Sequence, residues 1–327
     1  MTPELVGRRP TLTPSALVDQ LVPPPHFADA AFDTYLPDPD YPSQAAARER
    51  TRDFATRSVR RGIPGLRPTS GGTGLYLDGG YGVGKTHLLA AAAHAIGARA
   101  AFGTFVEYTH LVGALGFAAA RGELSRFALV CIDEFELDDP GDTLLMARLM
   151  RELTDAGVAV AATSNTLPDS LGEGRFAAED FRREIQAVAS LFTVVTIDGP
   201  DYRHRGDLRA PEPAAPALVE KVGGDPSGAV EDWAALVDDL WHVHPSRYGA
   251  YVAGIATLGL RDVAPLADQA QALRVVALVD RLYDRDVRIV ASGAPLDQVF
   301  PEDMLRGGYR KKYFRALSRL TAMAARE

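Results

Sequence analysis

The segment GGYGVGKT at residues 79–86 constrains this chain more than any other part of the sequence. It matches the spacing GxxxxGK[ST], in which glycines let the backbone wrap around phosphate oxygens with several N–H groups turned inward. An apolar run at 75–77 precedes it and a helix-like run at 86–95 follows it. This strand–loop–helix context favours a phosphate-binding loop over a glycine-rich turn with a chance lysine.

The loop predicts a role for each of its residues. Lys85 can reach the β and γ phosphates of a nucleotide as a point charge, and the Thr86 hydroxyl can ligate Mg²⁺. The other residues expected to contact the nucleotide lie in the loop or in the helical turn after it. They are Gly79, Gly80, Tyr81, Gly82, Val83, Gly84 and His87.

Two acids follow the apolar run at 128–132. A buried strand that ends in Asp133 and Glu134 places both carboxylates at the carboxyl edge of a sheet, where open α/β folds bind ligands. We expect Asp133 to hold Mg²⁺, directly or through water, and Glu134 to orient and deprotonate the attacking water. A solvated acidic turn is the alternative, and the phosphate loop in the same chain disfavours it.

Two further kinds of catalytic residue are suggested. Asn165 ends the sequence ATSN after the next apolar run, 158–162, where it could contact the γ-phosphate or the lytic water, or only close a turn. Arg175, Arg182 and Arg183 are candidates for an arginine that reaches a neighbouring subunit's γ-phosphate and stabilises the transition state. We favour Arg175, and a solvated helix face is the alternative for each of the three.

Short apolar runs alternate with helix-like segments from residue 71 onward, which predicts an α/β fold with a parallel sheet covered on both faces. The expected strands of this sheet are residues 75–77, 101–108, 128–132, 158–162 and 192–197, and a helix is expected at 177–189. Beyond a Pro/Ala-rich stretch at 206–218, we expect strands at 251–258 and 287–291 and helices at 268–283 and 301–325. The predicted regions are an N-terminal loop and helix segment (1–66), an ATPase core (67–205) and a C-terminal lid-like region (206–327).

Composition narrows the choice of partners and compartment. The net charge of −8 and the pI near 5.4 lack the basic footprint of a protein that binds mainly duplex phosphate. A single cysteine, Cys131, excludes an intramolecular disulfide, fits a reducing compartment and reads as a core residue. The N-terminus lacks the apolar region of a secretory signal, and the apolar run at 88–105 is interrupted by polar residues. We therefore expect a cytoplasmic protein without a transmembrane segment; peripheral membrane contact stays open.

Three other sequence features are candidate binding sites. His242 and His244 have a spacing that could bind metal, but a packing role is favoured because no third ligand is evident. The basic stretch at 306–319 could contact phosphate or an acidic partner, although a solvated helix face explains most of it. Within that stretch, Arg319 is a candidate nucleotide sensor.

Taken together, the phosphate loop, the strand ending in DE and the strand ending in TSN resemble an AAA+ P-loop ATPase core. Longer segments are similar to the ZapE cell-division ATPase family and its mitochondrial relatives. These segments are PSQ at 42–44, CIDEFELDD at 131–139, ATSNTLPD at 162–169, IDGPDYR at 197–203, LVDRLYDRDVRIVASG at 278–293 and LSRL at 317–320.

The resemblance implies a sheet with strand order 5-1-4-3-2, a C-terminal mixed α/β region, hydrolysis of ATP with Mg²⁺, and homo-oligomers that share sites. Bacterial members of the family are associated with the division ring and its tubulin-like protein FtsZ. The resemblance thus favours an enzyme that remodels a protein partner, with FtsZ as the candidate.

Three alternatives stay open at this point. A nucleic-acid-associated ATPase resembling helicase loaders would share the loop and the DE strand, but the acidic composition counts against it. A nucleotide switch that does not hydrolyse ATP would have no need of Glu134 as a water base. A small-molecule kinase is the least favoured, because no acceptor-binding signature is evident near the sheet edge.

Overall fold

A computed structural model of the chain describes residues 4–60, 74–80, 82–135, 140–167, 182–199 and 210–326. The chain divides into two compact units. Residues 13–23 and 27–205 make up the five-stranded unit, and residues 1–12, 24–26 and 206–327 make up the three-stranded unit. The N-terminal segment contributes to both units, and the three-region division expected from the sequence stays a prediction.

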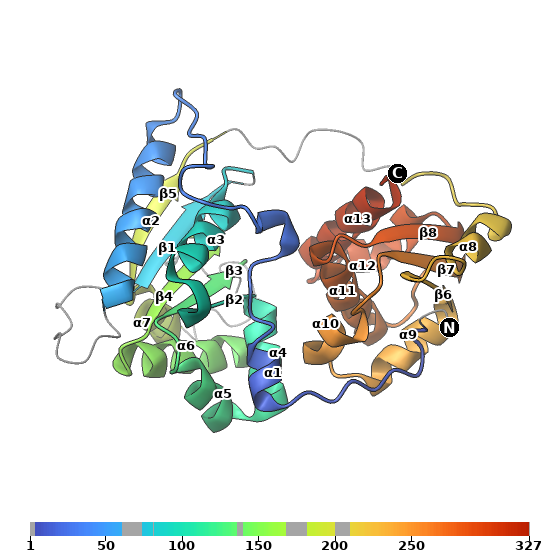
Figure 1. Ribbon diagram of the computed structural model, residues 1–327, viewed down its shortest axis with the longest axis horizontal. Helices are drawn as coiled ribbons and strands as arrows, with labels where there is room; N and C mark the ends of the chain where they lie inside the picture. The colour runs from blue at the N-terminus through green and yellow to red at the C-terminus, as the bar shows by residue number, and fades with distance from the viewer. Residues whose placement is uncertain are drawn as a thin grey trace. The chain divides into compact units, whose positions relative to one another are not determined.

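The five-stranded unit is built on a parallel sheet with the order β2-β3-β4-β1-β5 (Figure 1). This is the predicted order 5-1-4-3-2 read from the other edge, so the AAA+ P-loop fold is confirmed. The strands are β1 (Gly74–Gly79), β2 (Ala100–Thr104), β3 (Leu129–Asp133), β4 (Ala159–Ser164) and β5 (Phe192–Ile197). The three central strands are buried almost throughout, as expected when helices cover both faces of a parallel sheet.

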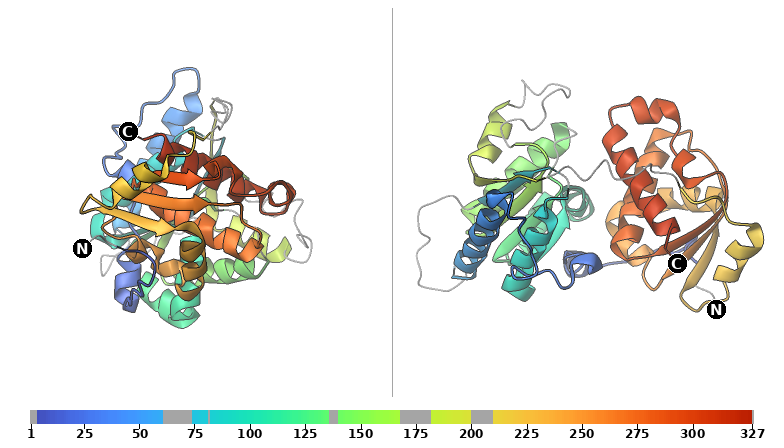
Figure 2. Two further views of the ribbon diagram at one scale, coloured as in Figure 1. Left: turned by 90° about the vertical axis from the view of Figure 1, so that its right-hand side faces the viewer. Right: turned by 90° about the horizontal axis from the view of Figure 1, so that it is seen from above.

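Helices surround this sheet. They are α1 (Pro14–Val18), α2 (Pro42–Arg60), α3 (Lys85–Ile96), α4 (Phe105–Leu115), α5 (Phe117–Leu124), α6 (Pro140–Asp155) and α7 (Arg182–Ala189). The crossover α3 packs on β1 to β4 and against α2, whereas α4 to α7 gather on the opposite face, as right-handed crossovers require (Figure 1 and Figure 2). Within the described ranges, no helix combines the length and apolar character needed to cross a bilayer.

The predicted strand at 101–108 is wrong in its second half. The strand ends at Thr104 and α4 begins at Phe105. Thr104 Oγ1 accepts a hydrogen bond from the Glu107 N–H, and the Glu107 carboxylate accepts one from the Thr104 N–H. This reciprocal capping box starts the helix where the apolar run alone suggested a continuing strand.

The three-stranded unit confirms the expected α/β character of the C-terminal region. Its sheet has the order β6-β7-β8 with all strands parallel, and comprises β6 (Gly228–Asp232), β7 (Thr257–Val263) and β8 (Arg288–Gly293). Its α-helices are α8 (Pro216–Val222), α9 (Trp233–Asp239), α10 (Tyr248–Tyr251), α11 (Gln269–Asp284), α12 (Glu302–Arg306) and α13 (Arg310–Ala324). α8 covers one face of this sheet, and α9, α11 and α13 lie on the other (Figure 1).

Two expectations for this unit are corrected. The predicted strand at 251–258 is a helical turn, a loop and only then β7, because the chain turns at Gly254 with φ at 79° before it enters the sheet. The predicted helix at 301–325 is divided into α12 and α13 around Gly307 and Gly308, since neighbouring glycines interrupt a helix readily.

Candidate active site

Three neighbouring strands of the five-stranded sheet end in the residues that the sequence singled out. Gly79 closes β1, Asp133 closes β3, and Asn165 follows β4. The connection leaving β1 runs toward β2, whereas the connection leaving β4 passes β1 to reach β5. Such a reversal is the topological switch point at which open α/β sheets bind ligands.

The phosphate-loop residues follow β1 directly. Gly82 and Gly84 have φ of 83° and 86°, a left-handed conformation that glycine adopts without steric cost. Gly79 lies against β5, since a Cβ there would be 2.4 Å from the Ile197 carbonyl oxygen. The loop thus turns tightly against the sheet, and its glycines are required by both conformation and space.

The Lys85 ammonium is largely buried and lies across the loop. Its Nζ donates to the carbonyl oxygens of Gly79 at 2.7 Å and Gly80 at 2.6 Å, and to Asn165 Oδ1 at 2.9 Å. A buried ammonium needs such oxygen partners. Lys85 and Asn165, which lie far apart in the sequence, are therefore in direct contact.

The Asp133 carboxylate is buried at the end of β3 and is held by two hydroxyls. Thr86 Oγ1 donates to Asp133 Oδ1 at 3.1 Å, and Thr163 Oγ1 donates to the same oxygen. Burial and the nearby charge of Glu134 raise the pKa of Asp133 to about 6, while the hydrogen bonds from Thr163 and Thr86 oppose that rise. Carboxylate and hydroxyl oxygens are hard donors that suit Mg²⁺, so Thr86 and Asp133 fit the cation predicted for them.

Glu134 stands just beyond the strand with an unusual backbone. Its φ is 52°, a left-handed conformation that costs a non-glycine residue about 1–2 kcal/mol. The Glu134 N–H donates to Thr163 Oγ1 at 3.1 Å, and the Phe135 N–H donates to the Thr163 carbonyl at 2.7 Å. Phe135 is itself fully buried. These anchors on both sides hold the Glu134 backbone in place.

Thr163 is a residue that sequence reasoning missed. Its hydroxyl donates to Asp133 and accepts from the Glu134 backbone, so it orders both acids together. The available signal was its place in ATSN, two residues before Asn165, because alternate residues of a strand share a face.

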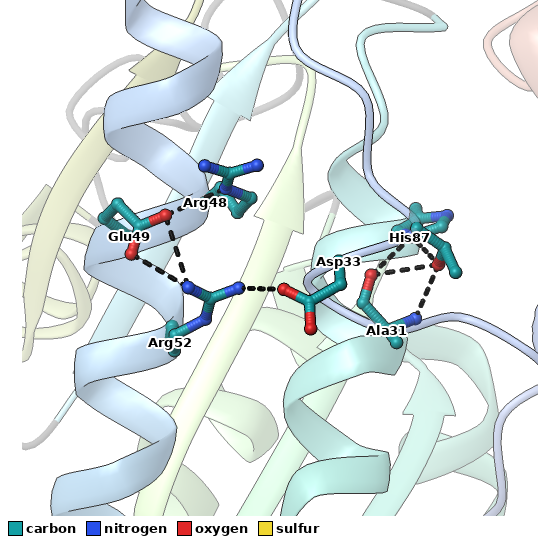
Figure 3. A network of polar contacts seen from close by, with 7 residues as sticks. Ala31, Asp33, Arg48, Glu49, Arg52 and His87 are labelled. Atoms are coloured by element: carbon teal, nitrogen blue, oxygen red, sulfur yellow. Dashed lines mark hydrogen bonds and ion pairs between the residues drawn. The ribbon is translucent and has the colours of Figure 1, made fainter.

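His87 points toward the N-terminal segment. Its Nε2 lies 3.0 Å from the Ala31 carbonyl oxygen and 3.1 Å from Thr34 Oγ1 (Figure 3). A further ion pair, between Asp33 and Arg52 at 2.6 Å, ties this segment to α2 (Figure 3). A contact between His87 and a nucleotide stays a prediction.

Some predicted residues lie outside the described part of the chain. These are Tyr81 of the loop and Arg175, the favoured arginine. Arg182 and Arg183 begin α7, but only their backbone is described. The roles proposed for all four stay predictions.

The remaining candidates have structural partners. Arg319 pairs with the Asp280 carboxylate and lies over the Tyr283 ring in the three-stranded unit. His244 Nδ1 lies 2.9 Å from Ser246 Oγ, and the described residues include no group of three or more His, Cys, Asp or Glu side chains placed to hold a metal. Cys131 is fully buried, which raises the pKa of its thiol and suits a core residue.

Comparison with known proteins gives the chain a family context. The model of a family described as AFG1-like ATPase matches residues 11–224 and 227–327. The cell division protein ZapE of Escherichia coli is 29% identical over 299 residues, covering 78% of this chain and 78% of that protein. An uncharacterized protein of Schizosaccharomyces pombe is 30% identical over 284 residues, covering 70% of this chain and 62% of that protein.

Similarity to solved structures is weaker. Domain III of the Thermotoga maritima replication initiation protein DnaA has a TM-score of 0.42 and 19% identity, covering 53% of this chain and 69% of that one. The DnaC helicase loader has a TM-score of 0.38 and 20% identity, covering 53% of this chain and 99% of that one.

Proposed function

The chain belongs to the AFG1-like ATPase family, and we propose that it hydrolyses ATP to ADP and phosphate with Mg²⁺ at the carboxyl edge of the five-stranded sheet. One observation carries this proposal. Two contacts lie at the switch point of the sheet, Lys85 with Asn165 and Thr86 with Asp133, and Glu134 is fixed directly beside Asp133.

Each residue has a part in the proposed reaction. When bound, the Mg²⁺ complex of ATP supplies a γ-phosphorus that water can attack in line with the leaving ADP oxygen. Lys85 exchanges its loop carbonyl partners for phosphate oxygens and offsets the charge that develops there. Thr86 and Asp133 hold the cation. Glu134 accepts the proton of the attacking water, and Asn165 orients that water or a γ-phosphate oxygen.

The energy of hydrolysis remodels a protein partner in this proposal. Support comes from the family and from a relative named as a cell division protein, which favours a cytoplasmic role in division. FtsZ is the first partner to test. The chain works as a homo-oligomer in which Arg175 of one subunit reaches the nucleotide of the next.

Steady-state ATPase activity across a range of protein concentrations tests the proposal. Wild type is compared with Glu134→Gln and Arg175→Ala, and nucleotide binding is measured alongside with and without Mg²⁺. We expect activity per molecule to rise with concentration. Glu134→Gln should lose about 10²–10⁴-fold in rate because the water base is removed, while ATP still binds.

The outcomes separate the parts of the proposal. Retained hydrolysis in Glu134→Gln would contradict the assignment of the base. Activity independent of concentration, with Arg175→Ala unchanged, would contradict the shared site. A wild type that binds ATP without turnover, even after FtsZ is added, would favour a nucleotide switch.

A further inference from the structure

Val83, in the middle of the phosphate loop, is held from several directions. The residue is 4% exposed, and its carbonyl oxygen accepts a hydrogen bond of 2.8 Å from the Tyr35 hydroxyl. Two glycines leave room for its methyl groups. A Cβ at Gly199 would lie 2.7 Å from Val83 Cγ1, and one at Gly79 would lie 3.2 Å from Cγ2. The side chain and the carbonyl of Val83 are therefore both fixed.

Tyr35 is in turn firmly placed behind the loop. It is 6% exposed, and its ring lies against Gly84, where a Cβ would be 2.4 Å from Tyr35 Cε2. The segment that carries it is tied to α3 by His87 and to α2 by the ion pair of Asp33 with Arg52 (Figure 3). Because both flanking helices hold this segment, the Tyr35 hydroxyl is a fixed donor.

A peptide unit is planar, and its C=O and N–H point in opposite directions when it is trans. The Val83 carbonyl and the Gly84 N–H belong to one such unit. Fixing the carbonyl toward Tyr35 therefore turns the Gly84 N–H away from Tyr35. This unit rotates about ψ of Val83 and φ of Gly84, and Gly84, whose φ is 86°, resists such a rotation little because it has no Cβ. The hydrogen bond from Tyr35 is therefore needed to fix the orientation of the unit.

We infer that Tyr35 is a positioning residue for nucleotide binding, which sets the Gly84 N–H as a preformed donor to a phosphate oxygen. The inference rests on the proposed function, because it assigns the loop a phosphate ligand. It extends the site to a residue 48 positions before Val83, outside every motif of the loop. Tyr35 acts through the backbone and does not touch the ligand.

The test compares Tyr35→Phe with Tyr108→Phe. Tyr108 is the matched control, because it too is buried in the five-stranded unit and its hydroxyl donates to a backbone carbonyl, that of Cys131, at 3.0 Å. Dissociation constants for ATP and ADP, kcat and KM, and thermal unfolding followed by circular dichroism are measured for both variants and wild type. The phenylalanine ring keeps the packing against Gly84 and removes only the hydroxyl.

We expect Tyr35→Phe to weaken ATP and ADP binding about 5–10-fold, the worth of one ordered hydrogen bond, and to raise KM more than it lowers kcat. Both variants should lower the unfolding temperature by similar amounts, because each loses one buried hydrogen bond. Tyr108→Phe should leave both dissociation constants unchanged. Gly199→Ala, which presses on Val83 from another direction, should also weaken binding.

Three outcomes overturn the inference. Equal losses of nucleotide affinity in Tyr35→Phe and Tyr108→Phe would mean that each substitution destabilises the five-stranded unit as a whole. If Tyr35→Phe binds ATP and ADP as tightly as wild type does, the hydroxyl has only a structural role. The proposed function would then still stand. A wild type that binds no nucleotide would overturn the proposed function and this inference with it.

Discussion

The two sheets of this chain are built alike, but the side chains at their carboxyl edges make different kinds of contact. Both are wholly parallel, and both join their strands through helices. At the carboxyl edge of the five-stranded sheet, Lys85 contacts Asn165 and Thr86 contacts Asp133. In the three-stranded sheet, Asp232 ends β6 by capping α9, where it accepts a hydrogen bond from the Ala235 N–H.

The order of the strands explains the difference. The five-stranded order β2-β3-β4-β1-β5 contains a reversal, and connections that depart in opposite directions leave room at the strand ends. The three-stranded order β6-β7-β8 follows the sequence without a reversal. The candidate active site lies at the edge that the reversal opens, so a parallel sheet by itself does not predict such a site.

Charged residues in the three-stranded unit serve its own packing. Asp239 pairs with Arg9 at 2.7 Å and accepts a hydrogen bond from the Tyr251 hydroxyl. Asp280 pairs with Arg315 at 2.9 Å and also with Arg319. The comparison therefore predicts that substitutions in one unit change nucleotide binding and substitutions in the other change stability.

The largest expected effect is that of Lys85→Ala. Removing this ammonium should lower ATP affinity by about 10²–10³-fold, because a buried, oriented cation at the phosphates is lost. Lys221→Ala, at an exposed position on α8, is the matched control and should bind as wild type. Titration with a fluorescent ATP analogue measures both, and similar losses in the two variants would refute the contrast between the units.

Asp280→Asn should destabilise the three-stranded unit by about 3 kcal/mol, since two arginines then lose their buried counter-charge. Both tryptophans, Trp233 and Trp241, lie in this unit, so tryptophan fluorescence during urea unfolding reports on it. The exposed Asp238→Asn is the control. A loss of ATP affinity in Asp280→Asn, with the unit still folded, would contradict the separation of roles.

The same carboxylate predicts a dependence on pH. Burial opposes ionisation of Asp280, but Arg315 and Arg319 outweigh it and lower its pKa below the ordinary 3.8. The folded protein therefore binds fewer protons than the unfolded chain near that pH. The stabilisation is complete above the ordinary value and is lost as pH falls through the folded pKa. The difference in unfolding free energy between wild type and Asp280→Asn should shrink on acidification, and a constant difference would contradict the ion-pair account.

A smaller effect is expected from Thr163→Val. Valine keeps the shape of the side chain but removes the donor to Asp133 and the acceptor for the Glu134 N–H, so the hydrolysis rate should fall about tenfold. ATP binding should change much less. Thr193→Val, on an exposed position of β5, is the control. An unchanged rate in Thr163→Val would show that the two acids need no shared anchor.

The smallest expected effect is that of Glu231→Gln. The Glu231 carboxylate accepts hydrogen bonds from the backbone N–H groups of Leu5 and Val6, and glutamine keeps one acceptor oxygen. We expect a loss of about 1 kcal/mol or less in the unfolding free energy, together with faster hydrogen exchange at Leu5. Protection at Leu5 equal to wild type would mean that apolar burial alone holds the N-terminal segment.

Local patterns were sufficient for the loop and for the strands that end in the site. Spacing placed Gly79 to Thr86 between a strand and a helix, and the apolar runs before Asp133 and Asn165 are β3 and β4. The sequence patterns predicted the wrong secondary structure where the same residue types occur in both strands and helices. The apolar run continues past Thr104 as a helix, because a capping box starts α4 there. Tyr251, predicted to begin a strand, is instead the last residue of the short helix α10, where it is buried.

The sequence by itself predicted the phosphate loop and the pair of acids, because each depends on residues within one short stretch whose backbone conformation is set locally. The AAA+ class followed from the resemblance of several such stretches taken together. Only the tertiary structure decided which distant residues hold that stretch in place. Tyr35 behind Val83, Thr163 between Asp133 and Glu134, and Leu5 on Glu231 are separated by 48, 30 and 226 positions. Such pairs meet because the sheet order and the packed core bring their elements together, and no local preference encodes that meeting.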